Sequence, residues 1–236
     1  SLINLYNSDF KTGTLRITKP GYYILREDVI FEPNKENGFM PTYEQIATKR
    51  YQVGRGGSYH LGFFAAITIE TENVILDLNG YTIQQSKLHN LMQRFFSVIE
   101  LANSPFIPSQ GPHDFGNNFL PANKVLIRNG KLGKSSHHGI HANSASNVIL
   151  CDIQIQDFEV AGIALNGSNN CIIDNIKIEK NSNPIVNHFF SQAVFARMHL
   201  KKLIDAEFEV KDAGTISENA EFPPCKTGES SMLYSA

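Results

Sequence analysis

Two stretches of the sequence, GIHANSASNVILCDIQIQDF (139–158) and GIALNGSNNCIIDNIKIEKN (162–181), decide the fold. They repeat one another at an offset of 23 residues, which pairs Gly139 with Gly162, Asn147 with Asn170, Ile153 with Ile176, and Ile155 with Ile178. Repetition at such a period is typical of chains that stack similar units against their neighbours. We therefore expect a stack of coils.

Two looser copies precede these. One is AAITIETENVILDLNGYTI (65–83), and the other begins FSVIELANSPFI (96–107) and continues after an insertion into NKVLIRNGKL (123–132). The Asn-Gly pairs at 79–80 and 129–130 lie 50 residues apart, a spacing that predicts two coils between them.

Apolar and polar residues alternate within each copy. Ile153 and Ile155 would point one way while Gln154 and Gln156 point the other, a period that predicts strands of about 3–5 residues. Stacking would align isoleucine on isoleucine. It would also place asparagines at one turn of every coil, where their amides can bond along the stack: Asn73, Asn123, Asn147 and Asn170.

This pattern resembles the pectin-lyase-like superfamily, best over residues 63–183, where NVILDLNGYTI (73–83) and the two 23-residue copies carry it. The resemblance implies an all-β fold: a single-stranded right-handed parallel β-helix, or solenoid, of about 23 residues per coil with a short flanking helix. The superfamily includes lyases, hydrolases, esterases, epimerases, viral spikes and adhesins, so the fold alone does not assign an activity.

We expect one domain over residues 1–236. Its parts are N-terminal strands and a cap (1–31, including TLRITKPGYYILREDVIF), a polar loop insertion (32–62), regular coils (63–187) with a proline-rich excursion (103–122), an amphipathic helix (188–204), and the start of further coils (205–236). The last part predicts that the natural chain continues beyond Ala236.

The charge balance is close to neutral, with 21 Lys and Arg against 23 Asp and Glu. This composition lacks the basic footprint of a nucleic-acid binder, and no apolar run approaches the roughly 20 residues that span a bilayer. Three cysteines make no disulfide framework. We expect no nucleic-acid or membrane partner. The absence of a leader and of disulfides favours an intracellular or virion-associated protein.

Stacking the copies in register predicts two rows of side chains on one outer face. The first row is Thr68, Glu100, His141 and Ala164, and the second is Ala65, Ser97, His138 and Ala161. Neighbouring coils lie about 4.8 Å apart, so Glu100 and His141 are expected to touch.

The resemblance also implies where catalytic groups would stand. Polygalacturonase-like relatives carry aspartates before the glycine of one coil and in the next, but here those positions are His137-His138 before Gly139 and Val160-Ala161 before Gly162. The acid pair of an inverting hydrolase is missing. No calcium site is visible either, so no cofactor is predicted, although scattered calcium ligands would escape this reading.

β-Elimination on a uronate needs a base, a positive charge or hydrogen-bond donor at the carboxylate, and an acid for the leaving oxygen. Histidine suits the proton transfers near neutral pH. We therefore predict a set of catalytic residues and a set of substrate-binding residues. The catalytic set is His141, His138, Glu100 and Arg94; the substrate-binding set is His137, Thr68 and Glu159.

The same residues have plainer interpretations. The three histidines could be polar residues of a solvated strand and turn, and Glu100 with His141 a surface pair. A zinc site from His138 and His141 has suitable ligands, although strand geometry favours a spacing of i, i+2. Two functions thus stand side by side: a protein that binds an acidic polysaccharide, as a lyase or epimerase, and a non-catalytic viral, spike or adhesin component, with oligomerisation open in both.

Overall fold

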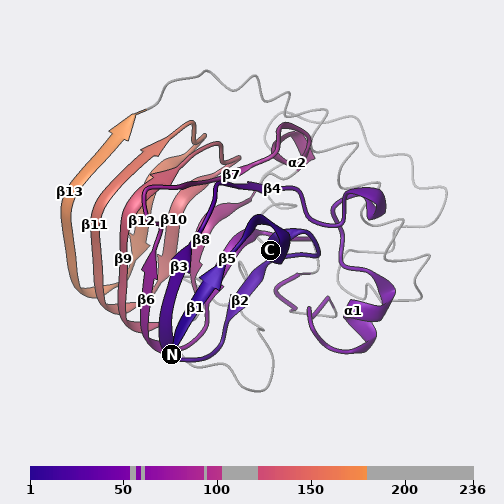
Figure 1. Ribbon diagram of the computed structural model, residues 1–236, viewed down its shortest axis with the longest axis horizontal. Helices are drawn as coiled ribbons and strands as arrows, with labels where there is room; N and C mark the ends of the chain where they lie inside the picture. The colour runs from indigo at the N-terminus through magenta and orange to yellow at the C-terminus, as the bar shows by residue number, and fades with distance from the viewer. Residues whose placement is uncertain (54–56, 60–61, 93–94, 103–121, 180–236) are drawn as a thin grey trace, which may run out of the picture.

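A computed structural model describes residues 1–53, 57–59, 62–92, 95–102 and 122–179. The described chain is mainly β, and it forms two sheets in which every paired strand is parallel (Figure 1). No helix in these ranges is long and apolar enough to cross a membrane.

We call the eight-stranded sheet, the larger of the two, sheet A, and we call the five-stranded sheet sheet B. Sheet A comprises β1 (Leu2–Leu5), β3 (Gly21–Leu25), β4 (Val29–Phe31), β6 (Glu72–Asp77), β7 (Thr82–Gln85), β9 (Asn123–Leu132), β11 (Ser146–Gln156) and β13 (Asn169–Glu179). Sheet B comprises β2 (Leu15–Ile17), β5 (Ala65–Ile69), β8 (Ser97–Leu101), β10 (His138–Asn143) and β12 (Ala161–Asn166).

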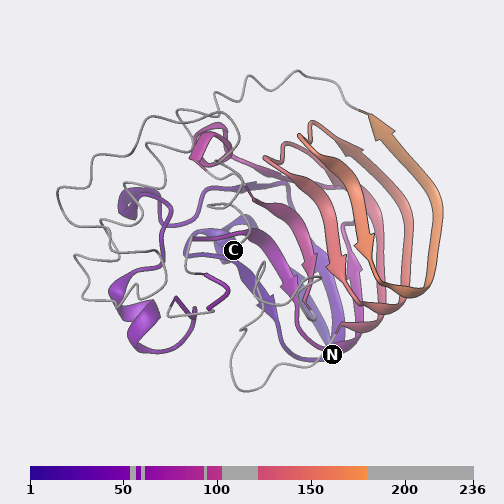
Figure 2. The ribbon, with the colours of Figure 1, turned by 180° about the vertical axis from the view of Figure 1, so that it is seen from behind.

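The chain passes repeatedly between the two sheets (Figures 1 and 2). Neighbouring strands within each sheet are therefore mostly not consecutive in the sequence. The order β1-β3-β6-β9-β11-β13 in sheet A runs beside the order β2-β5-β8-β10-β12 in sheet B. The predicted register of sheet B is confirmed: Ile67, Ile99, Ile140 and Ile163 are aligned. Residues 14–31 contribute β2, β3 and β4 to the same two sheets.

Two sequence predictions about the coils were wrong. The Asn-Gly pairs at 79–80 and 129–130 lie on adjacent passes, since β6 pairs directly with β9; the long stretch 103–122 accounts for the spacing. Strands β9, β11 and β13 have 10, 11 and 11 residues rather than three to five. Each contains two residues with φ between 47° and 59°, where the strand can bend without ending: Lys124 and Asn129 in β9, Asn147 and Asp152 in β11, and Asn170 and Asn175 in β13.

The asparagine ladder is present among Asn123, Asn147 and Asn170, whereas Nδ2 of Asn123 lies 3.5 Å from a carboxylate oxygen of Glu72 and not on Asn73. Nδ2 of Asn147 donates to Oδ1 of Asn123 at 2.8 Å, and Nδ2 of Asn170 donates to Oδ1 of Asn147 at 3.2 Å. The left-handed position of β9 is nevertheless Lys124, since Asn123 aligns with Ser146 rather than with Asn147. An asparagine one residue away can still join the ladder, because its side chain reaches across to the next coil.

Short helices lie at the edges of the stack. They are η1 (Asn7–Phe10), η2 (Lys35–Asn37), α1 (Tyr43–Ala47) and α2 (Lys87–Met92). The insertion 32–62 contains η2 and α1, and its Tyr51 and Tyr59 pack on Phe63 at the start of the next coil. The flanking helix expected at 188–204 and the coils expected from 205 lie outside the described residues, and α2 was not predicted.

Candidate functional site

A buried acid–base cluster lies on the outer face of sheet B, where β8 and β10 are neighbours. Nδ1 of His141 lies 2.8 Å and 2.9 Å from the two carboxylate oxygens of Glu100. The hydroxyl of Ser97 donates to Oε2 of Glu100 at 2.7 Å. Only 4% of Glu100 and 6% of His141 are exposed. The predicted contact is confirmed, while the interpretation as a solvated surface pair is wrong.

Two histidines of β10 lie face to face. The rings of His138 and His141 are stacked, with centroids 5.1 Å apart and planes inclined by 6°. A spacing of i, i+3 would put them on opposite faces of a regular strand. Here the two residues between them both face the core: Ile140 is fully buried, and a Cβ on Gly139 would lie 2.6 Å from the core residue Ile155.

The preceding coil repeats this break of alternation. Val98 and Ile99 are both fully buried, so Ser97 and Glu100 meet on the outer face. Regular strand geometry favours i, i+2 pairs, but on this face side chains at i, i+3 meet. Two consecutive inward residues, Val98-Ile99 in β8 and Gly139-Ile140 in β10, interrupt the alternation at the same place in both strands. This shared interruption was the sequence signal that residues three apart would meet on the outer face.

The ring of Phe95 packs against all three imidazoles. Phe95, just before β8, packs with its ring centroid 5.5 Å from that of His141 and 5.0 Å from that of His137. The rings of His137 and His138 are 4.1 Å apart and nearly perpendicular. Nδ1 of His138 is buried and makes no hydrogen bond within the described residues. Three imidazoles thus share one apolar wall.

The two stacked imidazoles have opposite pKa shifts. Burial lowers the pKa of His138 to about 3, and the neighbouring His137 and His141 act in the same direction. Burial would also lower the pKa of His141, but the charge of Glu100 and its hydrogen bond outweigh burial, so this pKa lies above its ordinary value. The cluster therefore places an imidazole that is neutral at neutral pH beside one whose protonated form is favoured by Glu100.

Two asparagines extend the cluster toward the next coil. Nδ2 of Asn166 lies 3.4 Å from Nε2 of His141 and donates to Oδ1 of Asn143 at 3.1 Å. Neither residue was predicted from the sequence, although their separation of 23 residues was the signal that would have found them. They give the second nitrogen of His141 a polar neighbour.

The remaining predicted residues fall in different places. Thr68 is fully buried and donates to Oε1 of Glu70 at 2.8 Å, so its hydroxyl is already engaged. Glu159 stands at the turn before β12, where its N–H donates to the carbonyl of Ser135, one coil away from the turn that holds His137. Arg94 lies outside the described residues.

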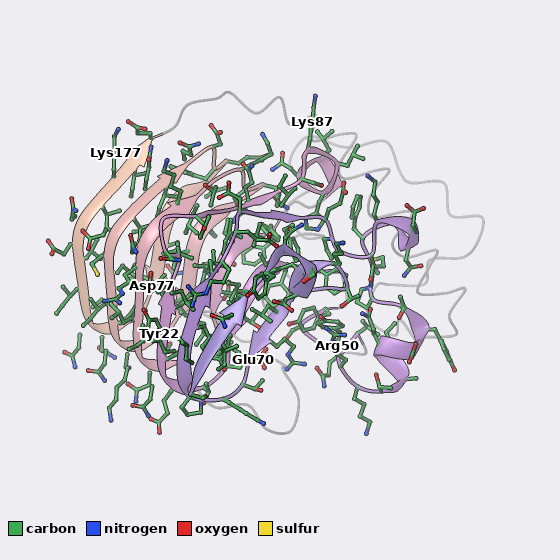
Figure 3. All side chains as sticks on the ribbon, viewed as in Figure 1. Tyr22, Arg50, Glu70, Asp77, Lys87 and Lys177 are labelled. Atoms are coloured by element: carbon green, nitrogen blue, oxygen red, sulfur yellow. The ribbon has the colours of Figure 1, made fainter. Side chains whose placement is uncertain are left out.

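A second charged cluster, also missed from sequence, lies two strands away on sheet B. The guanidinium of Arg16 donates to both oxygens of Glu70 at 2.7 Å, and its third nitrogen donates to the carbonyl of Arg50 (Figure 3, with Glu70 and Arg50 labelled). Hydrogen bonds and the charge of Glu70 raise the pKa of Arg16 against the lowering effect of its burial. This pair is fully satisfied by its own partners.

Neither cluster has the composition of a metal centre, since no group of three or more His, Cys, Asp or Glu side chains in the described ranges is arranged to hold an ion. Comparisons with protein families, with curated proteins and with solved structures found no match.

Proposed function

We propose that the two parallel sheets are walls of one right-handed parallel β-helix of the pectin-lyase-like type. The support is the alternation of the chain between sheets and the 23-residue register, which carries Ser146 onto Asn169 and His138 onto Ala161. Glycine at 139 suits this stacking, because a Cβ there would lie 2.5 Å from the carbonyl oxygen of Gly162.

We further propose that the protein binds an acidic polysaccharide and acts on it as a lyase or an epimerase. The observation that carries this proposal is the stacked pair His138 and His141 beside Glu100, with pKa values shifted apart. Titratable pairs with opposite shifts mark acid and base assignments in many enzymes. The described residues of this cluster lack the two carboxylates of an inverting hydrolase.

Each histidine has one role. Neutral His138 accepts the proton from the carbon next to the uronate carboxylate, and His141, whose protonated form Glu100 favours, stabilises the negative charge that develops on the carboxylate. A bound carboxylate raises the basicity of His138, since an opposite charge favours the protonated form. Glu100 is a positioning residue that fixes the ring and charge of His141.

The two activities differ in the fate of the electron pair left on that carbon. In a lyase it forms a carbon–carbon double bond while the bond to the leaving glycosidic oxygen breaks, and the leaving oxygen takes a proton from water. In an epimerase the carbon takes a proton from water on its other face, and no bond to oxygen breaks.

The test follows the abstracted proton. Polyuronates are incubated with the protein in D₂O, and deuterium at the carbon next to the carboxylate is measured by mass spectrometry together with the ultraviolet absorbance of unsaturated product. We expect incorporation or unsaturation with wild type, and a loss of about 100-fold or more with His138→Ala and with Glu100→Gln. Glu44→Gln, an exposed change on α1, is the matched control.

Absence of both signals on every polyuronate would contradict the catalytic proposal. If the polysaccharides also failed to bind, the non-catalytic viral, spike or adhesin component would be the remaining function. Binding without exchange would retain a carbohydrate-binding β-helix and remove the proton-transfer roles.

A further inference from the structure

The outer face of sheet A carries an apolar ladder that crosses all six strands of its main path. The register aligns one outward residue per strand, in the order Leu2, Tyr22, Ile75, Leu126, Ile149 and Ile172. We call this row the apolar ladder. With strands about 4.8 Å apart, its five intervals extend for roughly 24 Å.

The ladder is exposed to an unusual degree for such side chains. Leu2, Ile75, Ile149 and Ile172 are 58%, 37%, 39% and 56% exposed, and the two remaining members are half-buried. The inward neighbours in the same strands are core residues, such as Val148 and Leu150 on either side of Ile149. Strands that read as continuous apolar runs are typical of parallel sheets covered on both faces.

A charged row accompanies the ladder two residues further along the strands. It is formed by Asn4, Ile24, Asp77, Arg128, Cys151 and Asp174. Arg26 adds positive charge at its first member, because its Nε donates to Oδ1 of Asn4 at 2.7 Å. Asp77 and Arg128 pair at 2.9 Å, next to the hydroxyl of Tyr22 (Figure 3, with Tyr22 and Asp77 labelled).

Read from β1 to β13, this row is positive, neutral, negative, positive, neutral, negative. With the row reversed, Arg26 at one end of each copy meets Asp174 at the other end of its partner, while the Asp77–Arg128 pair, already formed within each copy, lies over the same pair in opposite order. A two-fold axis parallel to the strands, between β6 and β9, produces this reversal and also lays one ladder on the other. Such self-complementarity is what an isologous contact requires.

We propose that the apolar ladder of sheet A binds a second copy of this chain, with the two stacks antiparallel. The contact joins Ile75 of one copy to Leu126 of the other at its centre and Asp174 to Arg26 at both ends. A ladder of this size is at the small end of specific interfaces, so the dimer is weak and reversible.

Sedimentation equilibrium of the full chain tests the proposal at concentrations from about 1 to about 100 µM. Wild type is expected to pass from monomer to dimer within this range. Ile75→Glu and Ile149→Glu each place charge in the contact and weaken association about tenfold or more. Ile30→Glu is the matched control, since Ile30 is 54% exposed in β4 and lies off the ladder.

A charge exchange tests the antiparallel arrangement. Asp174→Arg alone brings two positive charges together at each end, and Arg26→Asp alone brings two negative ones together, so each weakens the dimer. The double variant restores opposite charges and is expected to recover wild-type association. A wild-type chain that stays monomeric, an assembly that grows beyond two copies, or equal weakening by Ile30→Glu would overturn the proposal.

Discussion

Polar side chains are usually exposed and apolar ones buried, but rows on the outer faces of the two sheets show the reverse. On sheet B the row containing Thr68, Glu100 and His141 is polar yet buried, whereas on sheet A the row containing Ile75 and Ile149 is apolar yet exposed. Both rows are aligned by the register of parallel strands. The two rows differ in their partners: the polar side chains have hydrogen-bond partners within the chain, whereas the apolar side chains remain exposed.

The polar row is satisfied within the chain. Glu100 accepts from Ser97 and contacts His141, and Thr68 donates to a glutamate that is itself paired with arginine. Hydrogen bonds of this kind offset the cost of burying charge. The apolar row needs no such partners, and its exposed surface is left for association. Four predictions test this contrast.

Lowering the pH is expected to change the free energy of unfolding more than any of the substitutions below, because buried neutral histidines lie in sheet B and in α2. Burial lowers the pKa of His89 and of His138 to about 3, while an unfolded chain has a value near 6.5. As the pH falls below about 6.5, the unfolded chain binds protons that the folded chain does not. The free energy of unfolding should fall by roughly 2 kcal/mol per histidine at about pH 5.

The measurement is urea unfolding at about pH 7 and about pH 5. His89 lies fully buried against Phe31 and Phe96, so His89→Phe is expected to remove about half of the acid effect. His141 acts oppositely: its raised pKa contributes stability below about 6.5 that is lost as the pH rises through the folded value. Equal wild-type stability at both pH values would contradict this assignment.

Removing one member of the buried Glu100–His141 pair is expected to have the second largest effect on the free energy of unfolding. His141→Ala leaves the carboxylate of Glu100 buried with only the Ser97 hydroxyl, which is expected to cost about 3 kcal/mol at neutral pH. Ile149→Ala on the exposed ladder is the comparison, and we expect it to cost less than about 1 kcal/mol. Equal losses in chemical denaturation would mean that the polar row is no more tightly integrated than the apolar one.

The stacking that aligns both rows depends on Gly139. A methyl group there would lie 2.5 Å from the backbone oxygen of Gly162 and 2.6 Å from Ile155, so Gly139→Ala should cost about 2 kcal/mol. Gly162→Ala meets only the side chain of Ile178 below 3 Å, at 2.9 Å, and is expected to cost about half as much. Thermal unfolding of both variants gives the comparison, and the reverse order would refute the predicted backbone clash.

The sequence was sufficient for the register of sheet B. The offset of 23 residues carries Gly139 onto Gly162, and inward isoleucines fix which side faces the core, so the contact of Glu100 with His141 could be predicted. Strand length could not, because a residue such as Asp152 can bend a strand through a positive φ without ending it. Asn and Asp at such positions are typical of turns, so the sequence predicts that the strand ends at them.

Burial of the polar row was also beyond the sequence. Whether His141 is solvated depends on what packs over it, and the ring of Phe95 reaches it from a position two residues before β8. The pairing of Arg16 with Glu70 was hidden for another reason: the two lie 54 positions apart, on either side of the insertion 32–62, and residues 14–31 contain no recognisable copy of the repeat from which a register could be predicted.

The smallest expected effect distinguishes an exposed ladder from one covered by a second copy. Ile75→Thr and Ile149→Thr keep β-branched side chains, so at low protein concentration each should change the free energy of unfolding by less than about 1 kcal/mol. At high concentration wild type gains stability from association, because the partner binds only the folded chain. The variants should lose that concentration dependence while Ile30→Thr keeps it. Wild-type unfolding that is independent of concentration would leave the apolar row of sheet A as an uncovered surface, and the contrast between the two sheets would then rest on the polar row alone.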